Sequence, residues 1–182
     1  MEFINKNPKI IILSGKAQSG KNECADIIKD YYEKIGLKTV VISYASYLKM
    51  YAKEVLGWDG NESTKPRDFL QQVGVELIKN KINPNMLIDR VTDDIRVYSY
   101  FFDIIAISDA RFVDEISVIK DNFSNVSVIH VLGKSNDLTF EQQSHSTETG
   151  LDNYNDYDFI INNGGSKDEL KKNILEVLKW IK

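Results

Sequence analysis

Cysteine, histidine and proline are scarce in this chain of 182 residues, which has one Cys, two His and three Pro. The single Cys24 excludes an internal disulfide. No cluster of Cys and His at zinc-ligand spacing occurs, and no Ser, His and Asp set points to a hydrolase. The sequence therefore gives no support to zinc or hydrolytic chemistry.

Arginine is also scarce, with four in the chain, and the 23 Lys and Arg are outnumbered by 27 Asp and Glu. The resulting net charge of -4 argues against a broad nucleic-acid footprint or an anionic membrane surface as partner. Few side chains can bind a phosphate through two parallel hydrogen bonds. Any anion site must therefore be local.

Long apolar runs are missing as well. Residues 1–9 lack the apolar core of a signal peptide, and no later stretch is apolar enough to span a bilayer. We expect one cytoplasmic domain over residues 1–182, while the sequence leaves open whether the chain forms a homodimer.

Short apolar runs, by contrast, recur along the chain, as expected for strands that are buried on both faces. They are Ile10–Leu13, Val40–Ile42, Ile104–Ile107, Val126–Leu132 and Phe159–Ile161. Segments with helical spacing separate them, which predicts an α/β three-layer sandwich: a mostly parallel five-stranded sheet with helices on both faces.

Two connections are too long for simple crossovers. Residues 44–102 are nearly all helical in pattern, which predicts a helical substrate-binding insert. Residues 133–157 are polar and join two buried strands, which favours a lid over a merely solvated connection.

The first apolar run leads into a glycine-bounded loop at the start of a predicted helix. Such a loop points several N–H groups and a helix N-terminus at an anion, which indicates a phosphate-binding loop (P-loop) rather than an ordinary glycine-rich turn. Lys21 adds a mobile charge for the outer phosphates. The loop reads Gly15, Lys16, Ala17, Gln18, Ser19, Gly20, Lys21 and Asn22.

Asn22 stands where the usual P-loop pattern has the Ser or Thr that holds Mg²⁺. We retain it as a candidate metal ligand. Cys24 follows in the same predicted helix, and we include it among the candidate cofactor-binding residues. The default interpretation of a lone cysteine at such a position is a small buried hydrophobic side chain.

Asp109 and Arg111 follow the third apolar run and should emerge at the carboxyl edge of the sheet, where ligands of such sheets bind. Asp109 is positioned to orient Mg²⁺ or its waters, and Arg111 to reach a phosphoryl group in transfer. The alternative is a surface pair that caps the next helix.

Arg67 and Gln71 lie four residues apart on a predicted helix of the insert, with Gly74 three further on. Arg67 can hold an acceptor phosphate and Gln71 a base edge, or both can belong to a solvated face. Arg90 is a second, weaker candidate for substrate binding.

In the lid region, His145 and Glu148 flank Ser146 and Thr147. These four residues either help to close the site, or Ser146 or Thr147 with a nearby acid merely caps a short helix. His130, inside an apolar run, is interpreted as a core histidine.

Taken in order, these segments resemble the deoxynucleoside monophosphate kinase family of bacteriophages and some bacteria, within the P-loop nucleoside monophosphate kinases. The resemblance covers nearly the whole chain. Besides the P-loop it rests on Tyr44–Lys49, Arg67 with Leu70, Gln71 and Gly74, Asp109–Phe112 with Glu115, His145–Glu148, and Asn162 before Gly164.

The resemblance implies ATP with Mg²⁺ at the P-loop, a nucleoside monophosphate acceptor near Arg67 and Gln71, and an approach of Asn162 and its neighbours to the adenine of ATP. Two alternatives stay open. One is a P-loop kinase of another small acceptor, such as dephospho-coenzyme A or phosphomevalonate. The other is a nucleotide-binding module without catalysis.

Overall fold

The computed structural model describes residues 2–133 and 146–181 and contains a five-stranded sheet in the order β2-β3-β1-β4-β5. All adjacent strands are parallel. The strands are β1 Lys9–Ser14, β2 Thr39–Ile42, β3 Ile104–Ala110, β4 Val126–Gly133 and β5 Phe159–Asn163. The five predicted strands are confirmed, because runs of Ile and Val suit a sheet that is covered on both faces.

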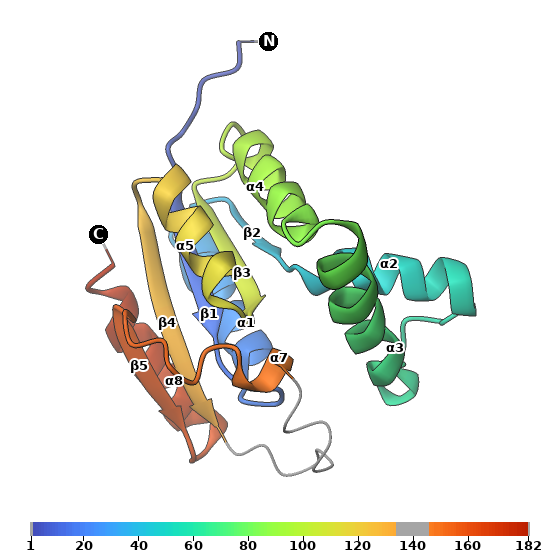
Figure 1. Ribbon diagram of the computed structural model, residues 1–182. Helices are drawn as coiled ribbons and strands as arrows, with labels where there is room; N and C mark the ends of the chain where they lie inside the picture. The colour runs from blue at the N-terminus through green and yellow to red at the C-terminus, as the bar shows by residue number, and fades with distance from the viewer. Residues whose placement is uncertain (1, 134–145, 182) are drawn as a thin grey trace.

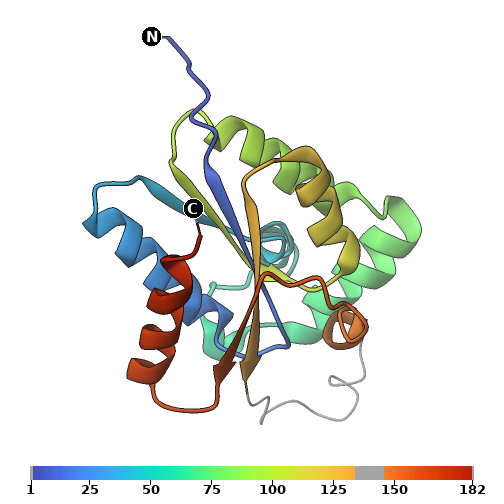
Figure 2. The same cartoon turned by 90° about the vertical axis from the view of Figure 1, so that its left-hand side faces the viewer.

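Helices cover both faces of the sheet, which confirms the three-layer α/β prediction (Figures 1 and 2). Helices α1 (Lys21–Lys34) and α8 (Lys167–Leu178) pack together on one face, and α4 (Met86–Tyr98) and α5 (Val113–Asn122) lie on the other. Helix α1 ends shortly before Gly36, which at φ 85° adopts the left-handed conformation that follows many helix ends.

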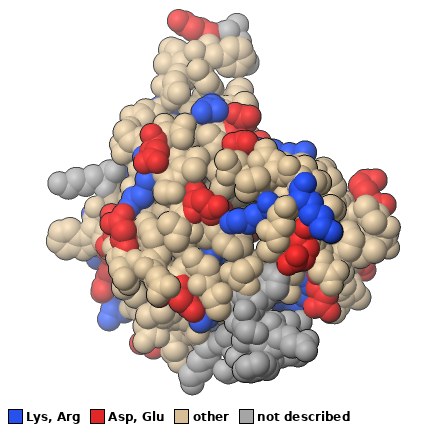
Figure 3. Space-filling view, in the orientation of Figure 1, with Lys and Arg blue, Asp and Glu red and all other residues tan. Residues whose placement is uncertain are grey.

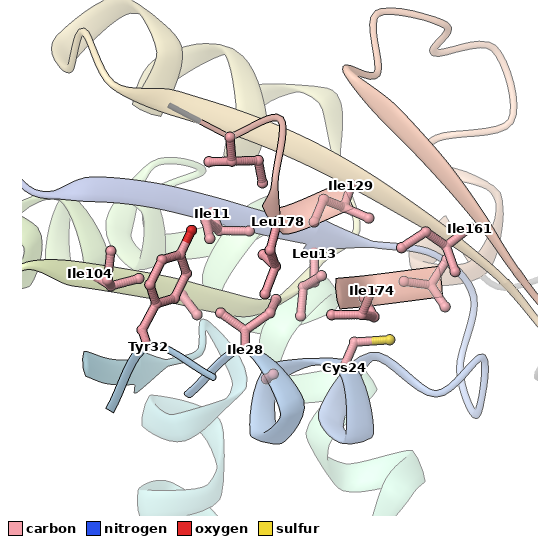
Figure 4. Close-up of a cluster of buried hydrophobic side chains, with 14 of the residues drawn as sticks. Ile11, Leu13, Cys24, Ile28, Tyr32, Ile104, Ile129, Ile161, Ile174 and Leu178 are labelled. Atoms are coloured by element: carbon pink, nitrogen blue, oxygen red, sulfur yellow. The ribbon is translucent and has the colours of Figure 1, made fainter. Parts of the chain in front are cut away.

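Each face has its own hydrophobic core. Beneath α1 and α8, Ile11, Leu13, Ile28 and Ile174 are fully buried (Figure 4). Cys24 lies in this core, and burial raises the pKa of its thiol to about 12. Its side chain therefore acts as a small hydrophobic group and does not reach the cofactor site for which it was a candidate.

The predicted insert divides into two parts. Helix α2 (Ala45–Leu56), the 3-10 turn η1 (Glu62–Thr64), helix α3 (Arg67–Gln71) and the π-helix η2 (Gln72–Ile82) project beside the sheet (Figure 1). Helix α4 instead buries Ile88, Val91 and Ile95 against the sheet. The projecting part is thus residues 45–82, shorter than the predicted 44–102, and the predicted helix that carries Arg67 and Gln71 continues from Gln72 as a π-helix.

The predicted lid, residues 133–157, is described only in part. The short helix α7 (Ser146–Thr149) lies at the carboxyl end of the strands, beyond β3 and α5 (Figure 1). The following residues Leu151, Tyr154 and Tyr157 pack on the core beside α5. Among the described residues, no helix is both long and apolar enough to cross a membrane.

Candidate active site

The P-loop connects the central strand β1 to helix α1. Gly15 has φ 137°, and a Cβ there would come within 2.4 Å of the Val131 carbonyl oxygen, so a side chain does not fit. Gln18 adopts the left-handed conformation at φ 60°, and the Ser19 N–H donates to the Lys16 carbonyl at 3.3 Å. The loop thus curls tightly over the N-terminus of α1, as anion binding requires.

Lys21, the first residue of α1, has its ammonium inside this loop. Its Nζ donates to the carbonyl oxygens of Gly15 and Lys16, each at 2.6 Å, and the residue is only 6% exposed. A buried ammonium held by carbonyl oxygens is aligned for an anion in the loop.

Asp109 is the penultimate residue of β3, next to β1, and the following Ala110 pairs with Ser14. Its two carboxylate oxygens accept the backbone N–H groups of Tyr44 and Ala45, each at 2.9 Å. Asp109 therefore holds a helix N-terminus, but that of α2 in the insert rather than that of the next helix along the chain.

The same carboxylate lines a cavity together with the side chains of Asn22 and Ser108. Each carboxylate oxygen has a second lone pair beyond the N–H bond it accepts. This set of carboxylate, amide and hydroxyl oxygens suits Mg²⁺, which is usually held by one or two carboxylates and by substrate phosphates. Among the described residues, no group of three or more acidic, His or Cys side chains forms a protein-only metal cage.

Arg111 lies just beyond β3, at the mouth of the same cavity. Its Nη1 donates to the Thr147 carbonyl oxygen at 3.2 Å, which links it to α7. Its backbone N–H donates to Glu115 Oε2 at 2.6 Å, and the N–H of Phe112 donates to the same oxygen at 3.1 Å. Glu115 thus fixes the backbone from which Arg111 extends.

Glu115 lines the cavity and is 7% exposed. Burial raises the pKa of its carboxyl to about 8, and the nearby charge of Asp109 raises it further, against the lowering effect of the Arg111 N–H. Tyr44 donates its hydroxyl to the Glu115 carbonyl at 2.8 Å. Burial raises the pKa of Tyr44 too, so its hydroxyl remains a donor.

On the insert side of the cavity lie Arg67, Gln71 and Gly74, which the sequence placed on one helical face. Gln71 Nε2 donates to the Thr147 hydroxyl at 3.4 Å, so the insert and α7 meet here. Arg90 is not among the cavity-lining residues. Its guanidinium lies over the rings of Tyr47 and Tyr51, 5.0 and 5.9 Å from the ring centroids, which links α4 to α2 of the insert.

The candidates from the C-terminal third of the chain have mixed positions. Asn162 is exposed at the end of β5. Its neighbour Asn163 makes the contact with the P-loop, donating to the Ser19 carbonyl at 3.0 Å. His145 and the side chain of Glu148 lie outside the described residues.

His130 is half-buried beneath the P-loop rather than in the centre of the core. Its ring stacks on Tyr157 with centroids 4.3 Å apart, and its Nδ1 lies 3.0 Å from the Ser14 hydroxyl. Burial lowers the pKa of His130, and the charges of Lys21 and Lys16 lower it further. A neutral imidazole that bonds to Ser14 fits the expected structural role.

Sequence reasoning assigned no role to several cavity-lining residues: Lys49, Glu62, Lys65 and Glu115. For Glu115 a signal exists, since an acid three residues into a helix often accepts the N–H groups before it. For the others the proximity depends on how the insert folds back, which no local pattern encodes.

The site as a whole is one cavity of about 370 Å³, which falls in the range typical of small-molecule sites. It extends from the P-loop to the insert. On the face of the molecule drawn in Figure 3, acidic and basic side chains are interspersed, in keeping with a local rather than a broad anion site.

Comparison with known proteins supports this description. The family model described as deoxynucleotide monophosphate kinase matches residues 37–174, more than half of the chain. No curated protein sequence matches significantly.

Solved structures share the fold at low identity. The Mycobacterium tuberculosis APS kinase CysC in complex with AMPPNP and APS has a TM-score of 0.58 at 11% identity, covering 95% of this chain and 98% of that chain. A gluconokinase from Sinorhizobium meliloti 1021 has a TM-score of 0.54 at 10% identity, covering 97% of this chain and 94% of that chain. The fold is that of P-loop kinases.

Proposed function

The chain belongs to the deoxynucleotide monophosphate kinase family, and we propose that it transfers the γ-phosphoryl group of ATP, with Mg²⁺, to a deoxynucleoside or ribonucleoside monophosphate. The products are the nucleoside diphosphate and ADP. The observation that carries the proposal is the common cavity, which is lined by Lys21 of the P-loop, by Asp109 and Arg111 at the carboxyl end of β3, and by Arg67 of the insert.

In this proposal the P-loop holds the phosphates of ATP through its N–H groups and the Lys21 ammonium. Mg²⁺, when bound by Asp109 and Asn22, would neutralise charge on the phosphates. Asn163 fixes the loop from the β5 side through its bond to Ser19, a contact distinct from the approach to the adenine of ATP that the resemblance implies for Asn162 and its neighbours.

Arg67 binds the acceptor phosphate, and Gln71 contacts the base edge. The acceptor oxygen is already anionic near neutral pH, so the transfer needs alignment and charge neutralisation rather than a strong base. Arg111 stabilises the phosphoryl group as it moves. The Arg111–Thr147 and Gln71–Thr147 contacts suggest that α7 closes the site, which would exclude water and suppress ATP hydrolysis.

All of the proposed contacts come from one chain, so the mechanism requires no second copy. The homodimer is left as a separate question that sedimentation would answer.

The test is ADP formation from ATP and Mg²⁺ with each deoxynucleoside and ribonucleoside monophosphate in turn. Lys21→Met should abolish acceptor-dependent ADP release, because it removes the buried ammonium. Lys171→Met is the matched control, since Lys171 is exposed on α8 outside the cavity. Release with dephospho-coenzyme A, phosphomevalonate, gluconate or APS alone would replace the proposed acceptor. ATP binding without any transfer would overturn the proposal in favour of a non-catalytic module.

A further inference from the structure

Two basic side chains, those of Lys65 and Arg67, lie against one carboxylate in the cavity wall that the insert provides, and Lys49 lines the same cavity. Lys65 Nζ lies 2.8 Å and Arg67 Nη2 3.6 Å from the same oxygen, Glu62 Oε1. The charges of Lys65, Lys49 and Arg67 hold the pKa of Glu62 below its usual value against the effect of its burial. All four residues line the cavity that contains the P-loop.

The position of Glu62 is fixed by the turn that carries it. The Asp59 carboxylate accepts the Asn61 N–H and the Thr64 hydroxyl, both at 2.9 Å, and the Asn61 side chain accepts the Ser63 N–H at 3.0 Å. None of these local bonds, which order the turn η1, involves the Glu62 side chain. The carboxylate can therefore leave its partners while the turn stays folded.

The basic side chains of this cluster are less exposed to solvent than its carboxylate. The Glu62 side chain is 65% exposed, whereas that of Lys65 is 19% and that of Arg67 37% exposed. Sheltered cations retain little water and favour an anionic partner, while an exposed carboxylate can return to solvent easily. Among the cavity-lining residues of this wall, the basic side chains of Lys49, Lys65 and Arg67 outnumber the single carboxylate of Glu62.

We propose that Lys49, Lys65 and Arg67 form the subsite for the acceptor's phosphate, and that the Glu62 carboxylate occupies this subsite until the acceptor displaces it. The inference rests on the proposed kinase function and extends it beyond Arg67. A tethered competitor has a high effective concentration, so only a group that binds the three cations more strongly than a carboxylate displaces it. A phosphate, with more charge and more acceptor oxygens, does so, and an unphosphorylated nucleoside does not.

Glu62→Gln tests the proposal, because it removes the charge and keeps the shape of the competitor. We expect the KM for the nucleoside monophosphate to fall about threefold to tenfold with little change in kcat, and the effect to shrink as salt is added. Lys65→Gln should raise this KM by a similar factor. Asp93→Asn is the matched control, because the Asp93–Arg96 pair has the same i,i+3 spacing and lies outside the cavity.

A binding measurement separates this proposal from the proposed function. Inorganic phosphate is titrated against each variant with the P-loop filled by a non-hydrolysable ATP analogue. Tighter phosphate binding by Glu62→Gln, without transfer to any nucleoside monophosphate, would support the proposed phosphate subsite. The same result would reject a nucleoside monophosphate as the acceptor. If Glu62→Gln matches Asp93→Asn in phosphate affinity and in KM, the cluster is an ordinary surface ion-pair network and the inference is wrong.

Discussion

The carboxylate of Glu115 accepts the backbone N–H of Arg111 at 2.6 Å, so a buried acid fixes the residue that is proposed to stabilise the phosphoryl group in transfer. The acid stands three residues into α5, whereas Arg111 lies just beyond β3. Strand end and helix start are thereby locked together at the mouth of the cavity. This arrangement makes the stability of the site depend on pH.

Burial raises the pKa of Glu115 from 4.5 to about 8. Between these values the folded chain keeps a proton that the unfolded chain has released, so the free energy of unfolding should fall as the pH rises through this window. Glu115→Gln should remove the fall in the free energy of unfolding that is due to the Glu115 proton, which amounts to about a few kcal/mol. Urea unfolding at about pH 5.5 and about pH 8.5 measures it.

Glu54→Gln provides the control, because Glu54 is exposed on α2. The parent and the control should lose the same stability between the two pH values, and Glu115→Gln should lose less. Equal losses in all three proteins would mean that Glu115 is ionised in the folded chain across this range.

Asn163 and Asn162 are adjacent, but only Asn163 is bonded to the P-loop, through the Ser19 carbonyl. Asn163→Ala should weaken ATP binding about threefold to tenfold, which corresponds to one lost hydrogen bond to the loop. Asn162→Ala, at the exposed neighbouring residue, should leave ATP binding unchanged. Isothermal titration with ATP compares the two, and a larger loss in Asn162→Ala would restore the assignment that the resemblance implied.

Gly133, at the end of β4, is pressed against the P-loop. A Cβ there would lie 2.5 Å from the Ser19 carbonyl oxygen and 2.6 Å from its Cα, where only backbone can respond. Gly133→Ala should therefore displace the loop and reduce ATP affinity at least about tenfold, by the overpacking energy of a close contact. Gly164→Ala is the control, because its Cβ would meet only a side-chain oxygen, at 3.2 Å. Similar ATP affinities for both variants would show that the loop tolerates the displacement.

Asp109 holds the N-terminus of α2 and is the proposed Mg²⁺ ligand. Asp109→Asn should lower kcat about 10- to 100-fold and raise the Mg²⁺ concentration needed for half-maximal rate, because an amide is a weaker metal ligand. Asp103→Asn is the control. Its carboxylate accepts the Lys38 N–H at 2.8 Å, but at the opposite end of β3. A loss of kcat with unchanged Mg²⁺ dependence would assign Asp109 to the support of α2 alone.

The sequence predicted the sheet and the P-loop because both are local patterns. A strand buried on both faces reads as a run of Ile and Val, and the loop requires Gly15 and Gly20 at fixed spacing. The ordered segments also indicated the kinase family, which the family model confirms. The extent of the insert was overestimated, because α4 has the same helical spacing whether it packs on the sheet or projects beside it.

Arg90 shows why a side chain's role could not be decided at the level of sequence. An arginine on an amphipathic helix can face a ligand or lie over aromatic rings of a neighbouring helix. The Arg90 guanidinium lies over the rings of Tyr47 and Tyr51 of α2. Asn163 and Asn162 pose the same problem on a strand, where successive side chains point to opposite faces and a shift of one residue changes which one reaches the loop.

The sequence by itself determined where the strands and helices lie along the chain, the phosphate loop and the family, because spacing along the chain encodes buried faces and tight turns. Only the tertiary structure decided which distant residues share the cavity. The Asp109 bonds to α2, and the position of the Glu62, Lys65 and Arg67 cluster in the same cavity as the P-loop, depend on how the insert is placed around the carboxyl ends of β1 and β3. That placement arises from packing between segments far apart in the chain, which no local pattern specifies.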